Sequence, residues 1–336
     1  MIPRYKITVG SIEIDSSSIT AAGMPVDIRV DLWLGKLNSA SLFLYLGDSG
    51  QVAPGDLVEI ELGESSSGGG LIPNPFGGGG DTDLVFTGIV SSAKRTLRSW
   101  EIWCSSALES MAKVRANKYY EKQKAGDIVN DLASIASVDT GSVENGMEYP
   151  YYAIGQDRSL WEHAAALAVQ NGYECYADTE DKLVFAPFPS NNSHSFDYGV
   201  NLLEAEADEQ TVGIEGVEVY GESPASLGEG PDASTWFTKE EVKGSAGSSS
   251  GNVWRVFDPS IRNTDTAGLA AEGILAQVET KRSGMAKVMG TAVVLGDEIE
   301  LNDAPGGIDG KYKAVRIRHL LNKHKGFVTT INFKEA

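Results

Sequence analysis

Two short stretches, GDLVEIEL at residues 55–62 and GDEIEL at residues 296–301, decide the fold predicted for this chain of 336 residues. In both, a Gly-Asp pair precedes a run in which acidic and apolar residues alternate, as expected of a strand with one buried face. A loop that contains Pro and Gly follows each run. One such match is weak evidence, because Gly-Asp turns are common in β proteins.

The segments that follow the two stretches also correspond. LVFTGIVSSAKR (84–95) precedes SWEIWC (99–104), and GKYKAVRIRHLL (310–321) precedes GFVTTINF (326–333). Each pair reads as a long strand, a turn and a returning strand. This ordered succession predicts one antiparallel β-barrel module that is used twice. We therefore expect a mainly β chain with barrels at residues 1–106 and 204–336.

Residues 107–203, between the two copies, change to a helical period. AGDIVNDLASIAS (125–137) places Ile128, Leu132 and Ile135 at the spacing of one helix face. A second helix is predicted from residue 159, and the strands YECYA and KLVFAP follow it with a turn at 179–181. The interval is expected to be an α/β insert domain that joins the two barrels.

The second helix of the insert contains a Trp-Glu-His triplet that invites a catalytic interpretation. Glu162 instead forms the Ser-x-x-Glu pattern of a capping box with Ser159, and Gly172 suits a left-handed helix end. Trp161 is expected to anchor the helix in a core. His163 has no nucleophile or second ligand near it in sequence, and the other histidines lack metal-ligand spacing. We expect a structural role and no catalytic residue, cofactor or metal.

Two loops and one helix interrupt the predicted barrels. The Gly-rich loop 63–83 lacks the Gly-Lys-Ser/Thr of a phosphate-binding loop, and it leads into a strand. Its apolar residues either dock onto a neighbouring chain or remain in solvent; the interface candidates are Leu71, Ile72 and Phe76. A long polar loop is expected at 222–252. A helix is expected at 266–282, with Leu269, Ile274 and Val278 on one side.

Composition excludes several classes of function. The formal charge of -19 and the pI near 4.6 argue against a nucleic-acid-coating or anionic-membrane surface, since phosphate neutralisation requires Lys and Arg. Two cysteines form neither a disulfide framework nor a zinc site. The sequence has no apolar run long enough for a membrane helix, and the N-terminus lacks the layout of a signal peptide. Synthesis and folding in a cytoplasm are expected.

The charge is unevenly distributed along the chain. Residues 204–243 are strongly acidic, whereas residues 311–334 carry seven Lys or Arg and no acid. Two interpretations remain open: a solvated acidic surface, or complementary faces that meet between subunits. In the second case Arg316 and Arg318 are interface candidates.

Two patterns support a resemblance to a known family. One is the Trp-containing helix that ends in Asn171, Gly172 and Tyr173 before a hairpin. The other runs from Gly310-x-Tyr312 through His319 to Gly326-Phe327. Together with the order of the other segments, they resemble the phage late control protein D family, the central hub of contractile-tail baseplates. They are also similar to the N-terminal part of VgrG proteins of type VI secretion.

This resemblance implies a non-enzymatic homotrimer that joins the sixfold tail tube to the threefold spike, with two tube-like barrels in each subunit. It implies Tyr312 and His319 as structural anchors, and it implies a tail tube protein, a spike and other baseplate proteins as partners. VgrG chains continue beyond the second barrel, so a separate spike polypeptide is expected here. Assembly is expected in the cytoplasm, within a phage tail or injection particle. The alternative is a secreted or surface carbohydrate-active enzyme or lectin with two β domains.

Overall fold

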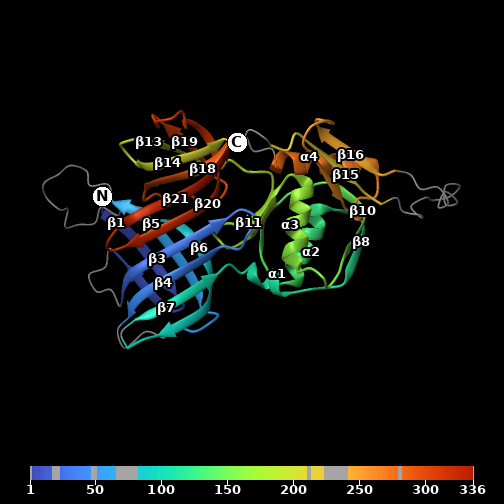
Figure 1. The fold of residues 1–336 in the computed structure, drawn as a ribbon. Helices are drawn as coiled ribbons and strands as arrows, with labels where there is room; N and C mark the ends of the chain where they lie inside the picture. The colour runs from blue at the N-terminus through green and yellow to red at the C-terminus, as the bar shows by residue number, and fades with distance from the viewer. Residues whose placement is uncertain are drawn as a thin grey trace.

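A large curled antiparallel sheet lies beside a smaller unit that contains the helices (Figure 1). The computed structural model describes residues 2–16, 23–46, 51–65, 82–97, 99–209, 213–222, 241–278 and 282–335. The chain is mainly β, as expected. Within these ranges no helix combines the length and the apolar character needed to cross a membrane.

The large sheet has thirteen strands, and its main path runs β14-β18-β21-β20-β3-β4-β7-β6-β5-β1-β2. Its first half comprises β1 (Ile2–Val9), β2 (Ile12–Asp15), β3 (Gly23–Trp33), β4 (Ser39–Leu46), β5 (Leu57–Ser65), β6 (Thr82–Arg95) and β7 (Trp100–Ser105). Its second half comprises β13 (Ser193–Asp197), β14 (Leu202–Glu209), β18 (Arg282–Met289), β19 (Glu298–Asn302), β20 (Gly310–Asn322) and β21 (Gly326–Glu335). Among the described strands of this large sheet, all pairings are antiparallel except that of β13 with β19.

The two halves repeat the same strand order, since β3-β4-β7-β6-β5 corresponds to β14-β18-β21-β20-β19. The Gly-Asp turns correspond in detail. Gly55 and Gly296 have positive φ angles of 94° and 93°, a conformation that favours glycine. In each turn the Asp carboxylate accepts a hydrogen bond from the backbone N–H three residues earlier, at 2.8 Å for Asp56 and 3.0 Å for Asp297. The sequence match therefore reflects one turn built twice.

Irregularities in the ladders recur at equivalent places. The register of β6 against β7 shifts between Val90 and Ser92, and that of β20 against β21 shifts between Ala314 and Arg316. Likewise β3 shifts against β4 between Pro25 and Asp27, and β14 shifts against β18 between Leu202 and Glu204. Such shifts add local twist to a strand, so the two halves curve in the same way.

The two halves share one sheet and are not separate barrels. β3 of the first half pairs with β20 of the second, from Trp33 opposite Arg316 to Asp27 opposite Asn322. Apolar side chains from both halves also form a single core. The expected repeat is thus present as a strand order that occurs twice. The two copies are not separate, because the hydrogen bonds between β3 and β20 join them into one sheet.

A second core holds the helical unit together. Its helices are α1 (Glu109–Lys113), α2 (Ala125–Ile135), α3 (Leu160–Asn171) and α4 (Thr264–Val278). Three small sheets accompany them: β8 (Lys118–Lys124) with β10 (Glu148–Ile154); β9 (Thr140–Val143) with β11 (Glu174–Ala177) and β12 (Leu183–Ala186); and β15 (Gly216–Tyr220) with β16 (Lys243–Gly247) and β17 (Val253–Phe257).

Residues 216–222 and 241–278 pack in the helical unit, although they lie inside the span 204–336 that was expected to form the second barrel. Val217 and Val219 of β15 are buried in the second core with the small residues of α4. The segment leaves the large sheet after β14 and returns at β18 (Figure 1). Strand β16 also lies within the span expected as a polar loop, 222–252, of which residues 223–240 are outside the described ranges.

Candidate interaction surfaces

The metal-ligating residue types and the two cysteines bear first on possible chemistry. Within the described ranges, His, Cys, Asp and Glu form no group of three or more that could hold a metal ion. Cys104 and Cys175 are buried and free, and burial raises the pKa of each thiol to about 12. Both cysteines are therefore protonated at neutral pH and are poor nucleophiles.

The junction of β3 and β20 carries four charged side chains, which we call the Asp31 cluster: Arg29, Asp31, Arg316 and Arg318. Asp31 accepts hydrogen bonds from Arg29 and Arg318, each at 2.7 Å, and Arg316 lies 3.3 Å away. Burial alone raises the pKa of Asp31, but the hydrogen bonds from the two arginines outweigh it and lower the pKa below its usual value. The cluster therefore ties the first half of the sheet to the second.

Trp33 orients part of this cluster. The Arg316 guanidinium lies 3.7 Å from the centre of the Trp33 ring, and the Lys36 ammonium lies 4.3 Å from it. The side chains of Arg316 and Arg318 remain 28% and 35% exposed. These two predicted interface residues thus contact their own chain first, and a contact with a neighbouring subunit stays a prediction.

A groove of about 560 Å³ lies between this junction and the helical unit. Its sheet side carries the basic residues Lys36, Lys313, Arg316 and Lys334, and its helix side includes Val169 and Tyr173. Glu174 also lines the groove. Burial raises the pKa of Glu174, whereas Lys313 and Lys334 act in the opposite direction. The groove thus combines four basic side chains with two carboxyl groups, Glu174 and Glu335, of which Glu174 is the partly desolvated one.

The anchors predicted on α3 lie where the sequence indicated. Ser159 and Glu162 form a reciprocal capping box, in which Glu162 accepts from the Ser159 N–H at 2.7 Å and donates its own N–H to the Ser159 hydroxyl at 3.3 Å. Trp161 is 8% exposed. Gly172 ends the helix in the left-handed conformation, with φ 66°. These residues fix both ends of α3 and its contact with the core.

Tyr312 and His319 both lie in the core of the large sheet. The Tyr312 hydroxyl donates to the Ile308 carbonyl at 2.6 Å, which closes the loop before β20. His319 is fully buried, with Nε2 3.0 Å from the Val293 carbonyl and Nδ1 3.0 Å from the Thr329 hydroxyl. Burial lowers the pKa of His319 to about 4, so the imidazole is neutral at pH 7. Both side chains therefore make hydrogen bonds that hold loops and strands of the large sheet together.

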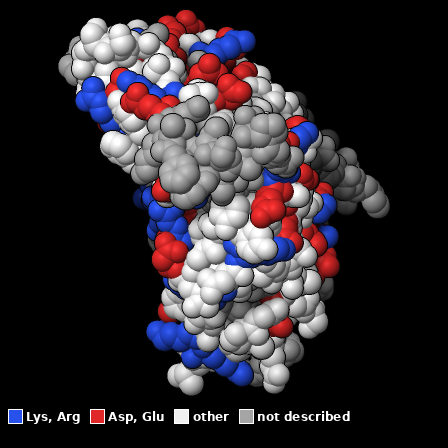
Figure 2. All heavy atoms as spheres, turned by 90° about the vertical axis from the view of Figure 1, so that its right-hand side faces the viewer, with Lys and Arg blue, Asp and Glu red and all other residues white. Residues whose placement is uncertain are grey.

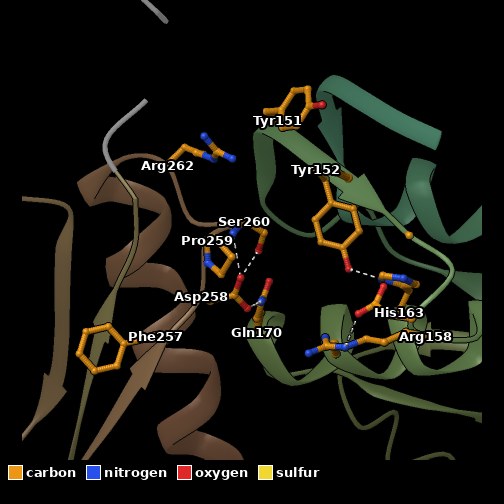
Figure 3. A pocket seen from close by; sticks show the side chains of 14 residues that line it. Tyr151, Tyr152, Arg158, His163, Gln170, Phe257, Asp258, Pro259, Ser260 and Arg262 are labelled. Atoms are coloured by element: carbon orange, nitrogen blue, oxygen red, sulfur yellow. Dashed lines mark hydrogen bonds and ion pairs between the residues drawn. The ribbon is translucent and has the colours of Figure 1, made fainter. Parts of the chain in front are cut away.

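A polar pocket of about 270 Å³ lies between α3 and the segment that follows β17 (Figure 3). The Tyr152 hydroxyl lies 3.2 Å from His163 Nδ1, and Gln170 donates to Asp258 at 2.5 Å. His163 Nε2 and Arg262 Nε are buried without a hydrogen-bond partner among the described residues. Burial lowers the pKa of His163. The hydrogen bond of the His163 ring goes to a tyrosine and not to a serine or cysteine.

The predicted interface residues Leu71, Ile72 and Phe76 lie outside the described residues. Asp31, in contrast, was not among the predicted residues. Its alternation with Arg29 in DIRVDLWL marks the outward face of a strand, but its partner Arg318 is 287 positions away. Only the pairing of β3 with β20 brings these charges together. Elsewhere, acidic and basic side chains share the face of the molecule seen in Figure 2.

Comparisons with known proteins gave matches in structure alone. No family model matches the sequence, and no curated protein matches it. The 43 kDa tail protein of prophage MuSo2 from Shewanella oneidensis is 13% identical, with a TM-score of 0.68 over 99% of this chain and 98% of that chain. A tail protein from Neisseria meningitidis MC58 is 14% identical, with a TM-score of 0.69 over 100% and 97%.

A third match is an Escherichia coli component of the type VI secretion system, which is described as structurally similar to the bacteriophage T4 tail proteins gp27 and gp5. It is 9% identical, with a TM-score of 0.59 over 98% of this chain and 77% of that chain. The chain therefore has the fold of these tail proteins along its whole length.

Proposed function

We propose that the protein is a structural component of a phage tail or a related contractile injection system, where it forms the baseplate hub between tail tube and spike. The observation that carries this proposal is the likeness of fold over the whole chain to two phage tail proteins. The E. coli match extends the same fold to a secretion machine. The agreement covers the helical unit as well as the large sheet, so it is not a likeness of one common β motif.

The repeat within the chain supports a homotrimer. A hub that contacts a sixfold tube and a threefold spike has to present six similar faces from three chains. Two similar halves in each chain satisfy this requirement, and the contacts between successive chains are then heterologous and close after three copies. The two halves of the large sheet, rather than two free barrels, are the units of this pseudo-sixfold ring.

In this proposal the chain has no enzymatic role and binds no cofactor. Its partners are further copies of itself, the tail tube protein, a separate spike protein and other baseplate proteins. It is assembled in the cytoplasm as part of the particle. Leu71, Ile72 and Phe76 remain candidates for contact with one of these neighbours.

Cryo-electron microscopy of the particle that contains this chain tests the proposal. We expect a layer of three copies between tube and spike, with the large sheets towards the axis and the helical units outside. A layer of six copies, or a chain that is absent from the tail, would reject it.

A further inference from the structure

We infer that successive copies of the chain are joined by a strand pairing that repeats the one inside each chain: β14 of one copy pairs with residues 93–95 of β6 in the next. The inference rests on the proposed function, in which the copies form a closed ring. It names the contact that holds them together and the residues that face each other in it.

The argument begins from the equivalence of the two halves. The matched register shifts align Asp27 of β3 with Glu204 of β14, and Ser92 of β6 with Arg316 of β20. Inside the chain β3 pairs with β20. The equivalent strands are β14 and β6, and they stand at unconnected places in the sheet of one chain. A second copy supplies the missing half of each pair.

Both strands have an open edge where this pairing requires one. The ladder of β6 with β5 reaches only Ile89, so residues 91–95 pair with β7 alone among the described strands. β14 pairs through residues 204–209 with β18 alone in the same part of the structure. Apolar side chains are exposed beside both edges, with Leu97 101% and Leu203 50% accessible. Open edges of this kind promote association unless a neighbour covers them.

Charge complementarity gives the contact its register. In the existing ladder Asp31 lies opposite Arg318, and their side chains form an ion pair at 2.7 Å. The equivalent positions place Asp208 of one copy opposite Lys94 of the next. β14 carries the outward acids Glu204, Glu206 and Asp208, whereas the end of β6 carries Lys94 and Arg95 and no acid. Lys94 is 67% exposed and also lies 3.4 Å from Glu101 of β7 in its own chain, so it would be shared between Glu101 and Asp208. In the internal contact β3 supplies the acid and β20 the base; in the contact between chains their equivalents, β14 and β6, supply the acid and the base in the same way.

Closure of the ring follows from the repetition. The internal contact and the contact between chains then alternate around the axis, and every chain contributes β14, β18, β21, β20, β3, β4, β7 and β6 to one continuous sheet. This arrangement removes both open edges, as closure does in any β-barrel. The closed ring also explains why the two halves keep the same register shifts although their sequences differ. In such a ring the twist of each half must fit the half beside it, and the register shifts contribute to that twist.

Charge reversal of the purified chain tests the contact by sedimentation velocity at low salt. We expect Lys94→Glu and Asp208→Lys each to weaken trimer formation at least about tenfold, because each sets like charges opposite one another. The double variant should restore it. The matched control is Lys6→Glu on β1, whose side chain is 40% exposed and lies outside the proposed contact. Melting curves establish that every variant is folded.

Cysteine pairing gives a second, independent readout. The native Cys104 and Cys175 are only 3% and 2% exposed, so they should remain unreactive. On oxidation we expect Lys94→Cys with Asp208→Cys to give covalent species of up to three chains, and Lys6→Cys with Asp208→Cys to give none. A trimer that shows neither the linkage nor the charge effect rejects the contact and leaves the proposed function standing. A chain that stays monomeric at all concentrations rejects both, and equal linkage in the control pair rejects the assigned register.

Discussion

Trp161 tests the second core at the level of one side chain. It lies in the first turn of α3 and is 8% exposed. We expect Trp161→Ala to lower the free energy of unfolding by about 3–5 kcal/mol, since removal of a buried aromatic ring leaves a cavity that the surroundings fill only in part. Trp103→Ala is the control, because Trp103 is 45% exposed on β7. Chemical denaturation of both variants measures the difference, and similar losses would contradict the burial argument.

His319 gives the stability a specific pH dependence. Its pKa in the folded chain is about 4, below the ordinary value of 6.5. Between these values the unfolded chain binds a proton that the native chain excludes, so the free energy of unfolding should fall as the pH falls from about 6.5 to about 4. The loss is on the order of 3 kcal/mol for a shift of this size.

Unfolding curves over this pH range measure the effect. His319→Gln removes the titrating ring and should flatten the dependence, whereas His324→Gln changes an exposed histidine and should leave it unchanged. An unaltered slope in the His319 variant would assign the dependence to other groups.

Residue roles that depend on local sequence were predictable, and those that depend on distant strands were not. The capping box of Ser159 and Glu162 needs only residues three apart, and the left-handed end at Gly172 needs only the helix before it. The Asp31 cluster needs a ladder between β3 and β20, which no local pattern specifies. The sequence therefore identified Arg316 and Arg318 as interface candidates but not the carboxylate of Asp31 with which they pair.

At the level of elements, the contact between α3 and α4 is made through two glycines. A Cβ on Gly273 of α4 would lie 2.5 Å from the Gln170 carbonyl oxygen and 2.6 Å from the Gly172 nitrogen at the end of α3. We expect Gly273→Ala to force the helices apart and to lower the free energy of unfolding by about 1–3 kcal/mol.

Gly268 provides the matched control in the same helix. A Cβ at this position meets nothing within 4 Å, so Gly268→Ala should raise the stability by about 0.5–1 kcal/mol through its better helix propensity. Thermal melts of the two variants should therefore shift in opposite directions. A stabilised Gly273 variant would show that the two helices have room to adjust.

The small residues of α4 also explain why its buried face was misjudged from the sequence. Leu269 was expected on that face, but it is 52% exposed, while Ala267, Ala270 and Ala271 are fully buried. Close helix packing selects small side chains, and a pattern based on large apolar residues overlooks them. For the same reason the sequence did not show that α4 and β15 belong to the helical unit.

At the level of the whole molecule, the order of the repeated elements was predictable from the sequence, because the compared strands follow one another directly in residues 55–104 and again in residues 296–333. What was not readable is that the copies share one sheet. The β3–β20 pairing joins residues 27–33 to residues 316–322, and strand pairing at such separations depends on the complete fold. The repeated strand order was therefore predictable from the sequence, whereas the equivalence of β14 and β6, which do not pair with each other in one chain, follows only from the strand registers of the structure.

The net charge of -19 bears on how copies of the chain associate. Part of the acidic segment is neutralised within the chain: Glu218 is paired with Lys243 at 2.9 Å and Arg255 at 2.8 Å, and these hydrogen bonds lower its pKa to about 2. Arg316 and Arg318 of the basic segment are likewise engaged by Asp31. Extended complementary faces between subunits are thus less available than the sequence suggested, which favours the solvated acidic surface.

Salt should then strengthen the proposed trimer. Subunits of the same sign repel one another over long distances, and that repulsion is screened as the Debye length falls from about 30 Å at 0.01 M salt to about 3 Å at 1 M. The Lys94–Asp208 contact is local and loses less to screening than the long-range repulsion does. We expect sedimentation equilibrium to show tighter association as salt rises over this range, with Lys94→Glu weaker than the wild type at every concentration. A trimer that dissociates as salt rises would show that acidic and basic faces meet between subunits well beyond the local contact of β14 with β6.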